Sequence, residues 1–425
     1  MKIWQLFSLI FVLLVSNTMG QIPEANYDET KVPHYRLPDP LVFQNHDKVR
    51  NTKDWELRRA EIIRLFETEV YGRVPEGELH PPSVEVIEHR GTTIGNRAVF
   101  RRQIALHFAK DDRKLTVNVL VYLPQNVKNP PVIVGYNFYG NHTIVEDRSV
   151  VLTEAWIPNS PEFGITENKA TEQSRGKRSY RWPVDKMINQ GLALATVYYG
   201  DVDPDRNDFT DGIHPFFYED EQTRPEEEEW GAIAAWAWGL SQVADYLQTD
   251  EYLKDSKYIL FGHSRLGKAA LWAGALDQRF SIVLSNESGC GGAALFRRKY
   301  GETAALINAN FPHWFNARFK SYNNHEEKLP VDQHMLIALM APRPVYIASA
   351  EGDPWADPKG EYLGGYHAGP VYALYGKPVL TNRNPPPTNQ PVHSAIGYHI
   401  RPGKHEVTDY DWEQFLKFIS RHIPK

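Results

Sequence analysis

Residues 258–272 read Tyr258-Ile-Leu-Phe-Gly-His-Ser264-Arg-Leu-Gly-Lys268-Ala-Ala-Leu-Trp272. The stretch starts as a short apolar strand, passes through a glycine-flanked turn that carries Ser264, and continues as an apolar helix. This order is typical of a nucleophile elbow, a turn that presents a serine hydroxyl at the edge of a sheet. The start of the helix can stabilise a negative oxygen there. We therefore predict that Ser264 is a nucleophile.

The spacing of the glycines departs from the usual G-x-S-x-G pattern. Gly262 precedes the serine as expected, but the second glycine, Gly267, comes one position late. A Gly-x-Ser sequence taken alone also fits a serine in a structural turn. The surrounding strand and helix are what favour a catalytic role.

Other short apolar runs extend this pattern along the chain, at 131–137, 192–199, 281–285 and 345–349. Continuous apolar strands that alternate with helical stretches indicate a parallel sheet covered on both faces. Upstream, residues 83–123 alternate like antiparallel strands, and residues 55–70 have helical periodicity. The predicted class is α/β, an α/β-hydrolase fold with a mostly parallel central sheet, helices on both faces and an N-terminal antiparallel extension.

Three further local predictions follow from the pattern. Thr223-Arg-Pro-Glu226 resembles a capping box and is followed by three more glutamates, which predicts a helix start there. The stretches 141–182 and 354–396 lack periodicity and are predicted to be long inserted loops. A final helix is expected from Asp411. Since no linker or repeat divides the chain, residues 21–425 are predicted to form one catalytic domain.

The composition excludes several classes of partner. The chain has 425 residues and a net charge of −6, so it lacks a general field for nucleic acid or anionic lipid. Cys290 is the single cysteine, which excludes an intrachain disulfide and a multi-cysteine zinc site. The histidines form no HxxxH or HExxH pattern. We expect a monomer with no metal, no cofactor and no nucleic-acid partner.

The first 20 residues have the pattern of an export signal. Lys2 precedes an apolar run over 3–15, and a polar segment then leads to a cleavage site before Gln21. The alternative is a membrane anchor, but the run is shorter than the roughly 20 residues that span a bilayer. We expect a bacterial protein that is periplasmic or secreted and has no membrane attachment after cleavage.

A serine nucleophile in this fold needs an acid and then a histidine later in the chain. Glu287 and Asp353 each follow a predicted strand, so both fall where open α/β sheets place their ligands. His405 comes after both. Among 16 histidines, one late in the chain is expected by chance. A serine, an acid and a histidine that follow one another in this order nevertheless predict a catalytic triad.

At these residues the chain resembles the glucuronoyl esterases of carbohydrate esterase family fifteen, particularly the bacterial members. The segments that carry the resemblance are Asn137–His142, Gly262–Lys268, Asn286–Gly292, Gly301-Glu302, Trp314-Phe315, Glu351–Pro358 and Gly403–His405. They extend over roughly residues 130–412. The resemblance implies a serine esterase that cleaves esters between 4-O-methyl-glucuronic acid on glucuronoxylan and lignin alcohols.

The resemblance also assigns roles to residues of this chain. It implies that Ser264 is the nucleophile, that His405 is the base and that Arg265 contributes to the oxyanion hole. It implies that the uronate sugar contacts Lys268, Glu302 and Trp355. Family members differ in which acid they use. We favour Asp353 over Glu287, because it follows the later strand, and we expect Arg297 and Arg298 to be surface charges outside the site.

Two other functions remain open at this stage. A triad does not encode its acyl group, so the chain could be a carbohydrate acetyl esterase or a general carboxylesterase. It could also be a non-catalytic xylan-binding relative, although the intact serine, histidine and two acids argue against that.

Overall fold

A ten-stranded sheet runs through the computed structural model, which describes residues 24–77, 79–219 and 221–423. The expected export signal lies outside these residues. In spatial order the strands are β1 (Ser83–Ile94), β2 (Arg97–Lys110), β3 (Arg113–Pro124), β5 (Ala193–Tyr198), β4 (Val132–Asn137), β6 (Tyr258–His263), β7 (Phe280–Asn286), β8 (Val345–Ala350), β10 (Ile396–Arg401) and β9 (Val392–His393).

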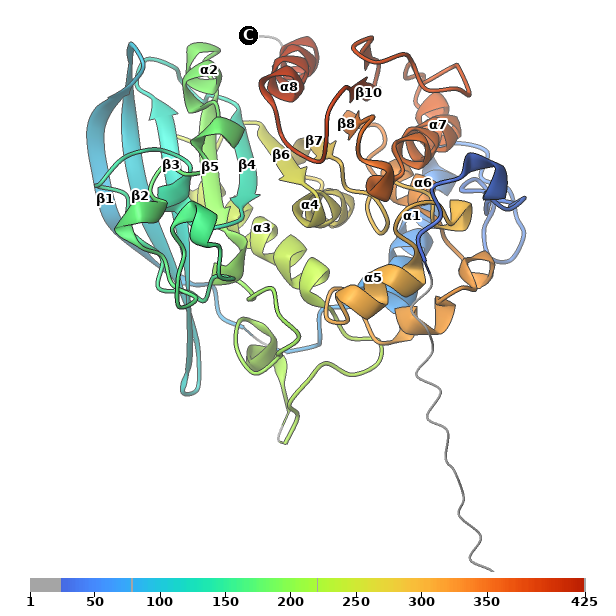
Figure 1. Cartoon of the computed structure of the whole chain (residues 1–425), viewed down its shortest axis with the longest axis horizontal. Coiled ribbons are helices and arrows are strands. Elements are labelled where there is room, and N and C mark those ends of the chain that lie inside the picture. The colour runs from blue at the N-terminus through green and yellow to red at the C-terminus, as the bar shows by residue number, and fades with distance from the viewer. Residues whose placement is uncertain (1–23, 78, 220, 424–425) are drawn as a thin grey trace, which may run out of the picture.

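The sheet has a parallel centre and antiparallel edges, which confirms the predicted fold class. From β5 to β10 every neighbouring pair of strands is parallel. The strands β1, β2 and β3 form the antiparallel extension at the left of Figure 1, and β9 closes the other edge. Because β4 to β8 are buried on both faces, their sequences are continuous apolar runs rather than alternating ones.

Helices cover both faces of the sheet (Figure 1). They are α1 (Thr52–Phe66), α2 (Val184–Asn189), α3 (Ala232–Thr249), α4 (Arg265–Leu276), α5 (Ala304–Asn310), α6 (Gln333–Ala338), α7 (Pro358–Leu374) and α8 (Asp409–His422). Residues of α2 and α8 share one apolar core with alternate residues of the central strands, while α1, α3, α4, α6 and α7 form the larger core on the other face.

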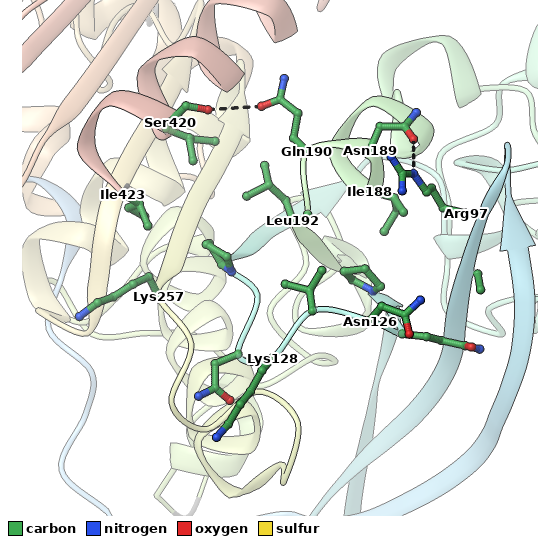
Figure 2. Close-up of a pocket in the computed structure, with 18 of the residues that line it drawn as sticks. Arg97, Asn126, Lys128, Ile188, Asn189, Gln190, Leu192, Lys257, Ser420 and Ile423 are labelled. Carbon is green, nitrogen blue, oxygen red and sulfur yellow. Dashed lines mark hydrogen bonds between the residues drawn. The ribbon is translucent and has the colours of Figure 1, made fainter. Parts of the chain in front are cut away.

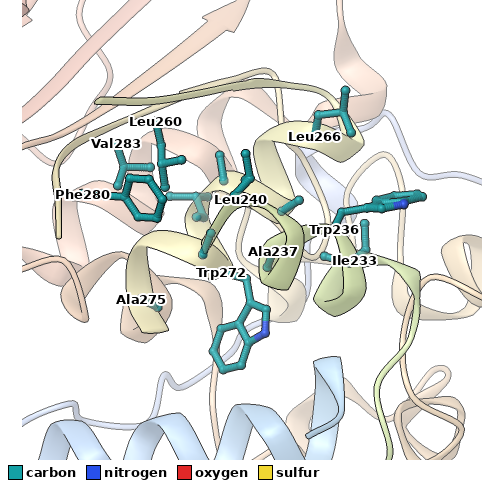
Figure 3. Close-up of a cluster of buried hydrophobic side chains, with 14 of the residues drawn as sticks. Ile233, Trp236, Ala237, Leu240, Leu260, Leu266, Trp272, Ala275, Phe280 and Val283 are labelled. Carbon is teal, nitrogen blue, oxygen red and sulfur yellow. The ribbon is translucent and has the colours of Figure 1, made fainter. Parts of the chain in front are cut away.

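The helix after the predicted elbow lies in the middle of the larger core. Figure 3 shows Ala237 and Leu240 of α3 beside α4, with Trp272 of α4 pointing toward α1. The Trp272 ring stacks on Tyr71, with ring centroids 4.6 Å apart, and also contacts Phe66. The helix that follows Ser264 is therefore held by packing on several sides.

The expected helix start at Thr223 is wrong. Residues 223–229 are irregular, with one turn at 227–228, and α3 begins only at Ala232 after Gly231. The backbone upstream of α3 pairs instead with the end of the N-terminal helical segment: Arg73 N–H donates to Glu228 O, and Gly231 N–H donates to Tyr71 O. This long-range pairing outweighs the local capping preference.

Other boundaries also differ from the sequence expectations. The stretch 354–396 contains the 17-residue helix α7, whose Gly-rich, Tyr-rich composition hides a helical period. Helix α8 begins at Asp409, two residues before the expected position, after a capping box formed by Thr408 and Asp411. The stretch 141–182 does consist of turns and short 3-10 segments.

Arg297 and Arg298 are buried and paired with Asp332 and Asp357, so the expectation of surface charges is wrong.

Within the described residues, none of the helices combines the length and apolar character that crossing a membrane requires.

The contacts of Trp272 predict a large effect on stability. Trp272→Ala removes a fully buried ring from between helices and should lower the free energy of unfolding by about 3–5 kcal/mol. Leu276→Ala, at a 38% exposed position of the same helix, should change it by about 0.5 kcal/mol or less. Urea unfolding of the two variants measures the difference, and equal effects would mean that α4 is not anchored as described.

Candidate active site

Ser264 occupies a strained turn between β6 and α4. Its backbone has φ 57° and ψ −129°, and its N–H donates to Asn286 O at 2.9 Å. A Cβ at Gly262 would come within 2.1 Å of Leu266 O, so only glycine fits before the turn. The late glycine has its own reason, because a Cβ at Gly267 would press on Ser288 at 3.0 Å. The elbow predicted from the sequence is therefore formed.

His405 lies beside this turn and contacts both candidate acids. Its ring centroid is 4.5 Å from that of His263, the residue before Ser264. Its Nδ1 is 2.6 Å from Asp353 Oδ2 and 3.1 Å from Glu287 Oε2. The side chain of His405 is 39% exposed, whereas both carboxylates are buried. Asp353 has the shorter contact, but the two acids share one imidazole nitrogen.

Arg401 distinguishes the two acids. Its Nη2 donates to Glu287 Oε1 at 2.5 Å, and Glu287 Oε2 also accepts from the N–H of Glu406 at 3.1 Å. The charge of Glu287 is thus already compensated by a guanidinium. Asp353 has no comparable cation among its hydrogen-bond partners in the described residues, so it is the better acceptor for the His405 N–H.

The two carboxylates change the proton affinity of His405. Burial lowers its pKa, but the hydrogen bonds and charges of Asp353 and Glu287 outweigh burial and raise the pKa to about 9. Burial raises the pKa of Glu287, against the opposing effects of His405 and Arg401. Both acids therefore favour the imidazolium that forms when His405 accepts a proton.

Arg265, the first residue of α4, is oriented by a buried acid. Its Nη1 pairs with Asp205 Oδ2, and its guanidinium lies 4.7 Å from the centroid of the Trp314 ring. Asp205 also accepts hydrogen bonds from Trp314 Nε1 at 2.8 Å, His313 Nε2 at 2.9 Å and Tyr199 OH at 3.0 Å. Burial opposes ionisation of Asp205, but Arg265 and these donors hold the pKa of its carboxyl well below the usual range.

The expected sugar-binding residues form a second group next to Arg265. Lys268 is buried, donates from Nζ to Ser288 O at 2.7 Å, and lies 3.6 Å from Glu302. Burial raises the pKa of Glu302, and Lys268 partly offsets this. Trp355 accepts from the Glu302 N–H through its backbone oxygen at 2.9 Å. The structure thus brings the three residues together, with Lys268 inside the protein rather than on a helix surface.

Comparison with known proteins agrees with this geometry. Residues 183–376 match the family model described as "Glucuronyl esterase, fungi". A carbohydrate esterase from an unknown prokaryotic organism is 47% identical over 98% of both chains.

The chain belongs to the glucuronoyl esterase family, carbohydrate esterase family 15.

Two solved members of the family superimpose closely on this chain. One is a promiscuous esterase of the family from a marine bacterial metagenome, with a TM-score of 0.87 and 48% identity over 94% of this chain and 100% of its own. The other is the glucuronoyl esterase from Solibacter usitatus, with a TM-score of 0.85 and 43% identity over 93% and 100%. The predicted family and its α/β-hydrolase fold are therefore confirmed.

Three residues around the site of this family member, Asp205, Trp314 and Arg401, were not predicted from the sequence. Asp205 lies in an acidic loop with no distinguishing spacing, so no signal marked it as the partner of Arg265. Trp314 was noted only as part of a shared segment, although both Arg265 and Lys268 lie over its ring. Arg401 ends a strand that the sequence analysis did not predict.

A separate cavity lies at the opposite edge of the sheet. Figure 2 shows Leu192 and Lys257, which directly precede β5 and β6, together with Ile423 after α8. The cavity has a volume of about 620 Å³. Because it borders the amino ends of the parallel strands, whereas Ser264, Glu287 and Asp353 follow their carboxyl ends, its size does not make it the reaction site.

The contacts of His405 predict unequal roles for the two acids. Asp353→Asn should lower kcat by several orders of magnitude, because the tautomer and orientation of His405 are no longer controlled. Glu287→Gln should lower kcat less and should shift the acidic limb of the kcat/KM profile to lower pH, since removing one negative charge lowers the His405 pKa from about 9. Hydrolysis rates across pH 5–10 measure both effects.

Glu351→Gln is the matched control, because this exposed acid follows the same strand as Asp353. It should leave both kcat and the pH profile unchanged. A larger loss in Glu287→Gln than in Asp353→Asn would reverse the assignment, and similar losses that do not add in the double variant would mean that the acids act as one unit.

The contacts of Asp205 predict that it positions Arg265. In Asp205→Asn the side chain keeps its shape but loses the charge that holds the guanidinium, so kcat should fall about 10- to 100-fold with little change in KM. Asp205→Glu should restore part of the loss.

The control is Asp208→Asn, an acid in the same loop that bonds only to Thr210 and a neighbouring arginine. It should leave kcat unchanged. A rise in kcat of Asp205→Asn would show instead that the pairing restrains the charge of Arg265.

Proposed function

We propose that this esterase hydrolyses the ester between 4-O-methyl-glucuronic acid on glucuronoxylan and lignin alcohols. The observation that carries the proposal is the juxtaposition of a serine elbow, a histidine bound to two carboxylates, and two cations, Arg265 and Lys268, over one tryptophan ring. The similarity to fungal glucuronyl esterases and to the glucuronoyl esterase from Solibacter usitatus supports the substrate class.

In the first half of the proposed reaction Ser264 Oγ attacks the ester carbonyl carbon. His405 accepts the serine proton at Nε2, while its Nδ1–H stays hydrogen-bonded to Asp353. The carbonyl π electrons move to oxygen, and collapse of the tetrahedral intermediate expels the alcohol, which takes the proton back from His405. A uronoyl–serine ester remains.

Arg265 is suited to stabilise the oxygen on which negative charge develops. Its guanidinium is fixed by Asp205 and by the face of Trp314, so little reorganisation is needed during the reaction. Losing one such donor typically costs about 2.7–4 kcal/mol of transition-state stabilisation. The N–H groups at the start of α4 add to the same field.

In the second half a water molecule replaces the serine. His405 removes a proton from the water, the resulting hydroxide attacks the acyl carbon, and the proton returns to Ser264 Oγ as it leaves. The product is a uronic acid, which loses its carboxyl proton to solvent and becomes a carboxylate. The Lys268 ammonium and the Glu302 carboxylate form a buried donor and acceptor pair that suits sugar hydroxyl groups.

A general carboxylesterase is the second candidate, because one structurally similar member of the family is a promiscuous esterase. That reading gives no role to the buried Lys268 and Glu302 pair, which a broad ester substrate would not need. The N-terminal sequence supports export, where plant polysaccharide would be met.

The proposed function predicts a substrate order. Wild-type protein should hydrolyse benzyl glucuronate and methyl 4-O-methyl-glucuronate much faster than acetylated xylan or 4-nitrophenyl acetate. Ser264→Ala should abolish turnover of the uronate esters without changing the melting temperature by more than a few degrees. Ser321→Ala, at an exposed serine, is the control and should keep full activity.

The alternatives have distinct outcomes. Equal rates on acetyl and uronate esters would favour a general carboxylesterase. Turnover of Ser264→Ala within tenfold of wild type would refute the nucleophile. Xylan binding without hydrolysis of any ester would favour a non-catalytic relative.

A further inference from the structure

Three potential metal ligands, one of them His405, lie close together beside the turn of Ser264. They are His263, Glu287 and His405, and one ligand atom from each lies within 4.8 Å of the other two. His263 and Glu287 are buried, while the partly exposed His405 leaves an entry from solvent. Two imidazoles and one carboxylate are a ligand set that zinc commonly takes in proteins.

The surrounding contacts occupy one polar atom of His263 and one of Glu287. His263 is bonded through Nδ1 to Asn286 Oδ1 at 2.5 Å, which leaves Nε2 as the nitrogen for a metal. A hydrogen bond to the far nitrogen is the usual support of a metal-binding histidine. Arg401 holds Glu287 through Oε1 in the same way, and Oε2 lies against His405.

Two of the ligand atoms lie slightly closer together than two ligands of one zinc ion. Glu287 Oε2 lies 3.1 Å from His405 Nδ1. Two atoms that each bind one zinc ion at about 2.0–2.2 Å in tetrahedral geometry are about 3.3–3.5 Å apart. One ligand atom of His263 lies within 4.8 Å of the other two, and its ring, tilted 36° over that of His405, must rotate toward them to complete the set. Asp353, 2.6 Å from the same nitrogen, lies close enough to reach the fourth position.

We propose that His263, Glu287 and His405 bind a zinc ion that inhibits the enzyme. A metal on His405 Nδ1 takes the place of the hydrogen that this atom donates to Asp353. The neutral imidazole then carries its single proton on Nε2. Since Nε2 must accept the proton of Ser264, the base is blocked, and the ion acts as an inhibitor rather than a cofactor.

Binding of the ion does not depend on the proposed function, but inhibition does. Binding is therefore measured first, in Ser264→Ala protein, with ZnCl2 by calorimetry and with CoCl2 by its visible absorption. We expect one ion per chain and the strong absorption of tetrahedral cobalt. In the Ser264→Ala background, His263→Gln should weaken zinc binding about tenfold or more.

The control for these titrations is His107→Gln in the same background. His107 of β2 and Glu85 of β1 form a histidine–carboxylate pair on the surface, with His107 Nε2 2.9 Å from Glu85 Oε2. This variant should bind zinc like its parent. Stoichiometric binding that is unaffected by His263→Gln, or no binding at all, would overturn the proposal. A second variant, Glu287→Gln, keeps the test valid if His263→Gln does not fold.

Inhibition is then measured in the wild-type background. ZnCl2 should abolish hydrolysis of benzyl glucuronate, EDTA should restore it, and MgCl2 should have no effect because magnesium prefers oxygen ligands. For each protein the rate with zinc is expressed as a fraction of its own zinc-free rate. His263→Gln should raise the half-inhibitory zinc concentration about tenfold or more above that of the wild type. Inhibition that is equal in both proteins would overturn the proposal. A chain that binds zinc but hydrolyses no ester would contradict the proposed function and leave the metal site standing.

Discussion

The site depends on one buried guanidinium, that of Arg401 at the end of β10. It donates to both oxygens of Asp411, which caps α8, and to Glu287 on the turn after β7. It also donates to the backbone oxygens of Pro402 and Lys404, so it braces the loop that carries His405. One side chain thus fixes a helix, a strand end and the loop of His405 relative to one another.

Burying Arg401 and its two carboxylates costs desolvation free energy. Arg401 and both of its carboxylates are buried, and the desolvation of three charges is offset only because each is satisfied by several hydrogen bonds. Asp411 is further satisfied by His399 and by the backbone and hydroxyl of Thr408. A similar arrangement around Asp205 holds Arg265. In both places a buried acid pairs with an arginine and leaves it little freedom to move.

The sequence predicted what arises from local pattern and missed what arises from long-range contact. The strands around Ser264 were predictable because buried parallel strands are continuous apolar runs. The elbow was predictable because a strand and a helix flank the turn, whereas the reason for the late Gly267 needed the structure. The start of α3 was not, because pairing with residues 71–73 overrides a capping signal. The roles of Asp205 and Arg401 could be recognised only from the structure, because their partners are distant in the sequence.

The backbone of Ser264 has a consequence for how this chain can change over time. Its φ of 57° and ψ of −129° lie where residues other than glycine are rarely found, and such strain costs of order 1–3 kcal/mol. A mutation to glycine at this position would relieve strain while removing the hydroxyl. With Ser264 as the proposed nucleophile, stability and chemistry are therefore opposed at a single residue, and selection for turnover keeps the serine there. Descendants freed from that selection would be expected to drift toward glycine at the turn, which would mark a chain that kept the fold after giving up the reaction.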